Sequence, residues 1–183
     1  MNTIRTDIDG LLIIEPQVFG DSRGYFVETW SKSRYEEVGI NCEFVQDNES
    51  KSSFGVLRGL HWQARPYAQA KLVRVISGAV LDVVVDIRKG SPTYGKHNAV
   101  ELSGENKRQL FIPKGFAHGF AVLSQEAVFA YKCDAPYAPK FERGMRFDDP
   151  SLGIDWRITP KQWILSAKDQ CLPLFDEIEP LEV

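Results

Sequence analysis

Residues 71–90 read KLVRVISGAVLDVVVDIRKG, and this stretch decides the fold class. It contains two runs rich in β-branched residues, Leu72–Ser77 and Val80–Ile87, with Gly78 between them. β-Branched side chains favour extended strands, and glycine permits the tight reversal that joins two neighbouring strands. The stretch therefore predicts a pair of antiparallel strands.

Similar apolar segments lie on both sides of this pair. They are Leu11–Pro16, Lys96–Leu102, Arg108–Ile112, Gly119–Leu123 and Val128–Cys133. Glycine, proline, serine and asparagine separate the segments at short intervals, as in Lys89–Pro92 and Ser103–Asn106. Short strands in this rhythm are typical of an antiparallel sandwich or barrel. Helical signals are confined to Ser31–Val38, with Ser31 as the N-cap, and to Pro160–Leu165, so we expect an all-β protein with a few short helices.

The whole chain, 1–183, is expected to form a single domain. Its 183 residues match the size of one domain, and no internal repeat, low-complexity stretch or linker interrupts them. The segment Pro150–Val183 contains Trp156, Trp163 and Phe175. Large aromatic side chains favour burial, so we expect this tail to pack on the barrel.

Charge and composition exclude several classes of partner. The formal net charge is −3, and lysine and arginine are scattered along the chain among acidic residues without a basic stripe, so we expect no polymeric nucleic acid partner. No apolar run approaches the ~18 residues that span a bilayer, and residues 1–10 are not typical of a signal peptide. We therefore expect a cytoplasmic protein with no membrane contact. The cysteines form no C-x-x-C pair, which predicts free, buried thiols at Cys42, Cys133 and Cys171.

The chain has three histidines, His61, His97 and His118. Residues 113–118 form a P-x-G-x-x-H turn that is similar to the second signature of cupin barrels. Metal-binding cupins also use H-x-H and a later glutamate, whereas residues 61–63 here are His-Trp-Gln. A three-histidine set would require His97 to move into the site, so we expect no bound metal.

His61 is then available as a general base. The ordinary pKa of histidine, about 6.5, suits proton abstraction near neutral pH, and a carboxylate on the other ring nitrogen would fix the tautomer. Asp169 is a candidate for that carboxylate. Tyr131 has two readings, as a reactive phenol or as a core aromatic bonded to the backbone. Polar residues at strand positions predict a lumen that binds an anion: Gln46, Asn48, Arg58, Lys71 and Arg74.

From about Ile13 to Lys168 the sequence resembles the dTDP-4-dehydrorhamnose 3,5-epimerase family. The stretches that carry the resemblance are DSRGYFVE (21–28), FVQDNES (44–50), GVLRGLHWQ (55–63), KLVRV (71–75), IPKGFAHGF (112–120), DDP (148–150) and GIDW (153–156). The resemblance implies a cupin-like jelly-roll barrel that needs no cofactor. It also implies a homodimer in which an N-terminal strand of one subunit joins its partner's sheet.

The family inverts C3 and C5 of dTDP-4-dehydro-6-deoxy-D-glucose on the way to dTDP-L-rhamnose, so the implied ligand is a small-molecule dTDP-sugar. Matching positions imply His61 as the base, Asp169 as its dyad partner and Tyr131 as the acid on the opposite face. Lys71 and His118 would face the C4 oxygen. The nucleotide and sugar would be held by Arg23, Glu28, Gln46, Asn48, Arg58, Glu142 and Lys168, with Tyr137 stacking on thymine.

Two departures from the family pattern concern the shape of the substrate site. Pro136 stands where relatives often carry an aromatic residue, and Trp62 stands where tyrosine or phenylalanine is usual. Three alternatives remain open at the level of sequence: an epimerase that inverts C3 only, a metal-dependent cupin enzyme such as a dioxygenase or isomerase, and a non-catalytic sugar-binding cupin. Relatives that act only at C3 share the dyad and the tyrosine.

Overall fold

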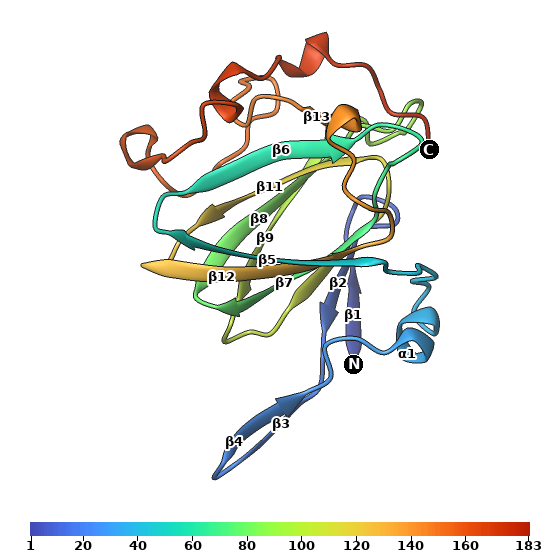
Figure 1. The fold of residues 1–183 in the computed structure, drawn as a ribbon, viewed down its shortest axis with the longest axis vertical. Coiled ribbons are helices and arrows are strands. Elements are labelled where there is room, and N and C mark those ends of the chain that lie inside the picture. Colours follow the sequence, from blue (N-terminus) through green and yellow to red (C-terminus); the bar gives the residue numbers. More distant parts are fainter.

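Two antiparallel sheets dominate the computed structural model, which describes residues 1–183 (Figure 1). The six-stranded sheet, in the order β1-β2-β10-β7-β12-β5, consists of β1 (Asn2–Arg5), β2 (Leu12–Glu15), β10 (Gln109–Ile112), β7 (Lys71–Ser77), β12 (Glu126–Cys133) and β5 (Gln46–Ser53). The five-stranded sheet, in the order β13-β6-β11-β8-β9, consists of β13 (Glu142–Gly144), β6 (Leu57–Gln63), β11 (Phe116–Val122), β8 (Ala79–Asp86) and β9 (His97–Ser103).

Helices are few and short. The α-helix α1 (Lys32–Glu36) follows Ser31, which occupies the N-cap position but makes no capping hydrogen bond through its side chain. The 3₁₀ turns are η1 (Pro139–Phe141), η2 (Pro160–Gln162), η3 (Asp169–Cys171) and η4 (Phe175–Glu177). None of these helices has the length and apolar character needed to cross a lipid bilayer. The prediction of an all-β, cupin-like fold with a few short helices is confirmed.

The alternation of side chains along β8 explains the continuous apolar run that marked the fold in the sequence. Val80 and Val84 face the core between the two sheets. Leu81, Val83 and Val85 belong to a second core on the other side of the five-stranded sheet. A strand covered on both faces needs apolar residues at nearly every position, because successive side chains point to opposite faces.

The second core is closed by the C-terminal tail, which crosses the outer face of the five-stranded sheet above β6 (Figure 1). Trp156 is 3% exposed, and Trp163 and Phe175 pack against the same cluster at partial burial. The tail is also tied to the sheet by an isolated bridge between Val56 and Ile164. The prediction that residues 150–183 pack on the barrel is therefore confirmed.

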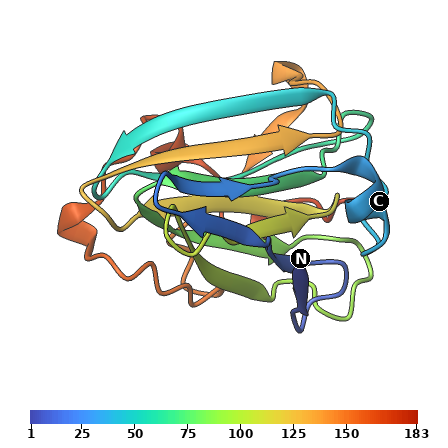
Figure 2. The same ribbon diagram turned by 90° about the horizontal axis from the view of Figure 1, so that it is seen from below.

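A two-stranded hairpin extends from the opposite end of the molecule. It is formed by β3 (Val18–Asp21) and β4 (Gly24–Val27), and it projects away from both sheets (Figure 1). We refer to residues 18–27 as the arm. Phe19 and Phe26 on the arm are 54% and 67% exposed. The view from below shows β10, β7, β12 and β5 lying side by side in the six-stranded sheet (Figure 2).

Two expectations about individual residues were wrong. Cys42, Cys133 and Cys171 are all free thiols, but only Cys133 is buried, whereas Cys171 is exposed in the short η3 turn. A turn on the surface of the tail has no second layer to cover it. Arg74 does not point into the lumen, because it alternates on β7 with Val73 and Val75, which occupy the inner core.

Candidate active site

The shortest polar contact in the lumen joins His61 and Asp169. His61 lies on β6, and Asp169 begins η3 in the C-terminal tail, which folds back over the end of the barrel. Nε2 of His61 lies 2.5 Å from Oδ1 of Asp169, and the backbone N–H of Asp169 donates to Oγ of Ser166 at 3.1 Å. Burial alone would raise the pKa of Asp169, but the hydrogen bond and charge of His61, with smaller contributions from Ser166 and Lys168, outweigh it and hold the pKa below its usual value. Asp169 is therefore a carboxylate that fixes the imidazole and leaves its other ring nitrogen free.

His118 is the neighbour of His61 across the β6–β11 ladder. Its Nε2 lies 2.9 Å from Oδ2 of Asp82, a residue of β8 that is fully buried. Burial lowers the pKa of His118, and the charge of Asp82 opposes this effect. The pair is held rigidly in the inner wall, so His118 can present a fixed polar group to the lumen.

Lys71 and Tyr131 face the two histidines from the other sheet. They lie on the neighbouring strands β7 and β12, and the Lys71 ammonium is 6.0 Å from the centroid of the Tyr131 ring. Burial lowers the pKa of Lys71 and raises the pKa of Tyr131. The phenol therefore keeps its proton at neutral pH. Its hydroxyl makes no hydrogen bond within the chain, although a core tyrosine would be expected to bond to the backbone.

The mouth of the lumen carries a second polar cluster. Tyr137 donates from its hydroxyl to Oε2 of Glu142 at 2.8 Å, and the Lys168 ammonium is 2.6 Å from the same oxygen. Burial would raise the pKa of Glu142, but the bonds from Lys168 and Tyr137 outweigh it and lower the pKa. Tyr137 is 54% exposed, so part of this side chain is open to a ligand.

These groups line two adjoining cavities of about 590 and 360 Å³. The cavities share His61, Lys71, Tyr131, Tyr137 and Glu142, which makes them parts of one continuous site. The larger cavity also contains Arg58, His118, Lys168 and Asp169. The smaller one contains Gln46 and Asn48, from the edge strand β5.

Two of the residues that the sequence placed in the site lie elsewhere in the protomer. Arg23, in the arm, bonds to Asp21 through its guanidinium, with Nη2 2.5 Å from Oδ2. Glu28, which follows the arm, pairs with Arg34 of α1 at 3.0 Å. Neither residue lines the two cavities. The arm projects away from both sheets (Figure 1).

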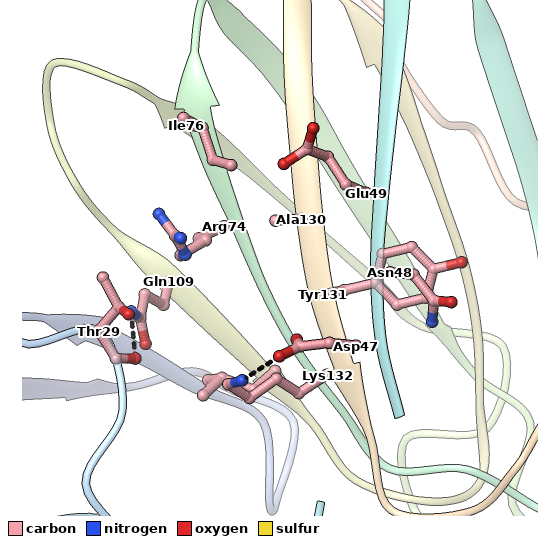
Figure 3. Close-up of a pocket in the computed structure, with 11 residues that line it drawn as sticks. Thr29, Asp47, Asn48, Glu49, Arg74, Ile76, Gln109, Ala130, Tyr131 and Lys132 are labelled. Carbon is pink, nitrogen blue, oxygen red and sulfur yellow. Dashed lines mark hydrogen bonds and ion pairs between the residues drawn. The ribbon is translucent and has the colours of Figure 1, made fainter. Parts of the chain in front are cut away.

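The outer face of the six-stranded sheet has a separate hollow, shown in Figure 3. Arg74 projects into it beside Asp47 and Lys132, which form an ion pair at 2.6 Å. Tyr131 and Asn48 extend to the other side of the same strands (Figure 3). Alternation along β12 and β5 therefore separates this hollow from the lumen that contains His61.

Several residues that shape the site were not singled out from the sequence. They are Ser52, which accepts hydrogen bonds from Arg58 at 3.2 and 3.3 Å, Ser166, Gln63 and Asp82. Gln63 had been noted only as the residue in place of the second histidine of H-x-H, and Asp82 had a further signal in the sequence. A single carboxylate inside the run VLDVVV needs a buried partner, because an unpaired buried charge is costly.

The third histidine does not join the other two. His97 pairs with Val85 at the start of the edge strand β9, and it lines neither cavity. No group of three or more histidine, cysteine, aspartate or glutamate side chains is placed to hold a metal ion.

Comparison with known proteins identifies the family. The model of the dTDP-4-dehydrorhamnose 3,5-epimerase family matches residues 5–177. A dTDP-4-dehydrorhamnose 3,5-epimerase from Shigella flexneri is 57% identical over 170 residues, which cover 92% of this chain and 93% of that protein. The chain belongs to the dTDP-4-dehydrorhamnose 3,5-epimerase family. It is therefore an isomerase, and the reading as a non-catalytic binding protein is set aside.

Solved structures of epimerases share the fold. A dTDP-6-deoxy-D-glucose-3,5-epimerase from Legionella pneumophila, in complex with dTDP-4-keto-L-rhamnose, superimposes with a TM-score of 0.95 at 54% identity, covering 99% of this chain and 97% of the other. A 3'-monoepimerase from Streptomyces bikiniensis, in complex with dTDP-quinovose, gives a TM-score of 0.85 at 34% identity, covering 92% and 85%. The family fold thus accompanies both epimerase activities.

Proposed function

We propose that the protein inverts C3 and C5 of dTDP-4-dehydro-6-deoxy-D-glucose, as a dTDP-4-dehydrorhamnose 3,5-epimerase. The observation that carries the proposal is the placement of His61 and Tyr131 in one cavity, on strands of opposite sheets. Inversion at a carbon requires a base on one face of the sugar and an acid on the other. A lumen with one such group on each wall meets that requirement.

In the first step His61 removes the proton from the carbon next to the ketone. The electron pair of the C–H bond moves toward the C4 oxygen, so the product is an enolate and the imidazole becomes an imidazolium. Asp169 stabilises that cation through its 2.5 Å contact with Nε2. The carboxylate also holds the ring in one orientation, as the dyad requires.

The enolate oxygen needs fixed positive or hydrogen-bonding groups. Lys71 and His118 line the same cavity as His61, and we assign them to the C4 oxygen. One preorganised donor of this kind is worth about 3 kcal/mol in the transition state. Their fixed positions matter because they need no reorganisation when the charge develops.

In the second step Tyr131 donates its phenolic proton to the opposite face of the same carbon. The raised pKa of Tyr131 keeps that proton available at neutral pH. The phenolate then regains a proton from solvent, and the imidazolium loses one. Substrate and product are isomers, so the cycle consumes no cofactor, and it runs once at C3 and once at C5.

The nucleotide and its diphosphate account for the rest of the site. Arg58 and Lys168 supply positive charge at the cavity wall, and arginine suits a phosphate through its planar fork of donors. Tyr137 offers an exposed ring for stacking on thymine. Gln46, Asn48 and Glu142 offer hydrogen-bonding groups for the base and sugars.

The positions of Arg23 and Glu28 favour a homodimer as the active form. Both residues lie away from the cavity in their own protomer, whereas the arm presents exposed Phe19 and Phe26. Exposed aromatic side chains of this kind mark surfaces that pack against a partner. We infer that a second copy of the chain receives the arm and that Arg23 and Glu28 complete the partner's site. The resulting enzyme would act in the pathway to dTDP-L-rhamnose.

The test follows solvent deuterium into dTDP-4-dehydro-6-deoxy-D-glucose by NMR. Exchange at both C3 and C5 with formation of the L-sugar is the expected result. The second candidate, an epimerase of C3 only, is favoured by the likeness to the 3'-monoepimerase. Exchange confined to C3 would replace the first proposal with the second, and no exchange at either carbon would reject both.

A further inference from the structure

The segment that carries Tyr137 has no strand or helix of its own. Residues 134–138 connect β12 to η1, and their backbone–backbone hydrogen bonds are confined to the two ends, from the N–H of Asp134 to Ala70 and from the N–H of Phe141 to Ala138. Glutamine side chains supply several of the missing partners. Gln69, in the loop between β6 and β7, donates to the carbonyl of Ala135 at 2.7 Å.

Gln63 makes the most complete set of these contacts. Its Nε2 donates to the carbonyls of Pro136 at 3.1 Å and Tyr67 at 2.7 Å, and its Oε1 accepts from the N–H of Ala138 at 2.6 Å. The side chain is 4% exposed. Both amide protons and the amide oxygen are thus used, in a setting where an unpaired polar group would be costly.

Gln46 completes the arrangement from the other sheet. Its Oε1 accepts from the N–H of Tyr137 at 2.8 Å. The backbone on both sides of Tyr137 is therefore fixed by one glutamine from β6 and one from β5. With its backbone held, Tyr137 reaches Glu142 through its hydroxyl, and Glu142 contacts Lys168.

Position 63 requires a side chain that donates to two carbonyls and accepts from one N–H, and only an amide of this length does so. Gln63 lies two residues after His61 on β6, so both side chains point to the same face of the sheet. A glutamate would lack the two donors, and an imidazole could not donate to two carbonyls while it accepts from an N–H. Gln63, which stands in place of the second histidine of H-x-H, thus uses its side chain to bind the backbone of the loop that carries Tyr137.

We propose that Gln63 is a positioning residue for Tyr137 and thereby sets the affinity for the nucleotide half of the substrate. The proposal rests on the proposed function in one respect, the stacking of Tyr137 on thymine. Fixing the loop before the ligand arrives reduces the entropy lost on binding. Gln63 does not touch the reacting carbons in this assignment, so it affects binding and not the proton transfers.

The experiment compares the wild type with Gln63→Met, which keeps the length of the side chain and removes the amide. The dissociation constant of dTDP is measured by calorimetry, and kcat and KM are measured with the dTDP-4-keto sugar. We expect the Kd of dTDP and KM to rise about tenfold with kcat nearly unchanged, which is the loss of roughly one net hydrogen bond. Gln63→Asn, with an amide too short for both contacts, is expected to act in the same direction and serves if Gln63→Met does not fold.

A double-mutant cycle separates positioning from a general structural role. In a Tyr137→Ala background, Gln63→Met should raise the Kd of dTDP no further, because the ring through which it acts is absent. An equal rise in both backgrounds would overturn the proposal. Ser103→Ala is the matched control, since the buried Ser103 accepts from the N–H of Asn106 in a turn outside the site and its loss should lower stability alone.

The outcome also distinguishes this proposal from the proposed function. A wild-type protein that binds dTDP but does not exchange protons at C3 or C5 would reject the function and leave the cycle with dTDP intact as a test of Gln63. An active wild type whose Gln63→Met and Gln63→Asn variants keep the parental Kd and KM would reject the role of Gln63 alone.

Discussion

His61 and Asp169 are 108 residues apart in the chain, yet their side chains meet at 2.5 Å. The contact forms because η3 brings the tail back over the end of β6. Asp169 is 3% exposed, whereas the His61 side chain is 27% exposed. The carboxylate is therefore shielded and fixed while the imidazole remains accessible to a ligand, as expected of a general base.

Replacement of His61 by alanine should abolish proton exchange. We expect His61→Ala to lower the exchange rate at both carbons by at least ~10²–10⁴-fold, the usual contribution of one general catalyst. The residue lines a cavity, so the fold and the affinity for dTDP should change little. Deuterium incorporation and a thermal unfolding curve check the two parts. A variant that retains most of the exchange would remove His61 from the mechanism.

Removal of the Tyr131 hydroxyl should separate exchange from inversion. Tyr131→Phe keeps the ring that packs against the inner core, so stability should stay close to that of the parent. His61 would still take protons and return them from the same face, whereas delivery to the opposite face would fail. NMR should then show deuterium incorporation with far less epimer. Parental rates of inversion would show that the phenol is not the acid.

Lys71 and Arg58 should respond differently to substitution. Lys71→Met should lower kcat more than it raises KM, because the enolate charge appears only as the reaction proceeds. Arg58→Met should mainly raise KM, because a diphosphate carries its charge from the start. Steady-state kinetics on the two variants provide the comparison. The reverse pattern would exchange the two assignments.

At the scale of the elements, strand alternation divides the chemistry between faces. On β12, Tyr131 faces the lumen, whereas the neighbouring Lys132 forms its ion pair with Asp47 on the outer face (Figure 3). On β8, Asp82 faces inward beside His118, and Val83 next to it lies in the core beneath the tail. One strand thus contributes to the site on one side and to stability on the other.

The loop after β8 is organised by one buried carboxylate. Asp86 accepts hydrogen bonds from Arg88, Ser91 and Thr93, and although burial opposes them, these bonds lower its pKa from 3.8 to about 2. A pKa that is lower in the folded state stabilises the fold above pH 3.8, and this contribution is lost as the pH falls toward 2. Asp86 is fully buried, so the contribution at neutral pH is about 2 kcal/mol.

Asp86→Asn should therefore lower the free energy of unfolding by about 2 kcal/mol at pH 7. The difference from the wild type should shrink between pH 4 and pH 2, because the carboxylate of the unfolded chain takes up a proton below pH 3.8 while the folded one stays charged until about pH 2. Urea denaturation at pH 7 and near pH 2.5 measures both quantities. A difference that is independent of pH would show that the hydrogen bonds of Asp86 do not depend on its charge.

At the scale of the whole molecule, the two sheets form a lumen whose reactive groups come from both walls. The arm projects away from both sheets of its own protomer (Figure 1). Its aromatic residues are exposed, and its arginine is far from the cavity that the resemblance assigns to it. A dimer in which the arm crosses to the partner resolves both observations.

Complementation between two inactive variants tests that arrangement. In the proposed dimer, Arg23→Ala would remove a residue that acts on the partner's site, and His61→Ala would remove the base of its own site. In a mixed dimer, the subunit that carries Arg23→Ala keeps His61 and receives Arg23 from its partner, so one site is intact. Co-refolded mixtures should regain activity that neither parent has. Their failure to do so, with mixed dimers detected by mass spectrometry, would place Arg23 outside the partner's site.

The sequence predicted most of the buried strands, with the exception of β6, and missed most of the exposed ones. The sequence revealed β7, β8 and β12 because each of these strands is covered on one or both faces. A covered face requires apolar residues in a regular pattern. β5 reads QDNESKSS and lies at the edge of its sheet, where most side chains meet solvent. No apolar periodicity marks such a strand, and its pairing with β12 gives it its structure.

The sequence by itself determined the fold class and, through its motifs, the family and most of the polar residues that line the cavity. Tertiary structure alone decided that Arg74 faces outward and that Gln63 binds the loop of Tyr137. It also shows the contact of Asp169 with His61 that the family resemblance implied. Burial patterns are local and can be read along one strand, because the alternation of side chains is fixed by the backbone. Contacts between distant segments depend on how the sheets and the tail pack, and no local pattern encodes that geometry.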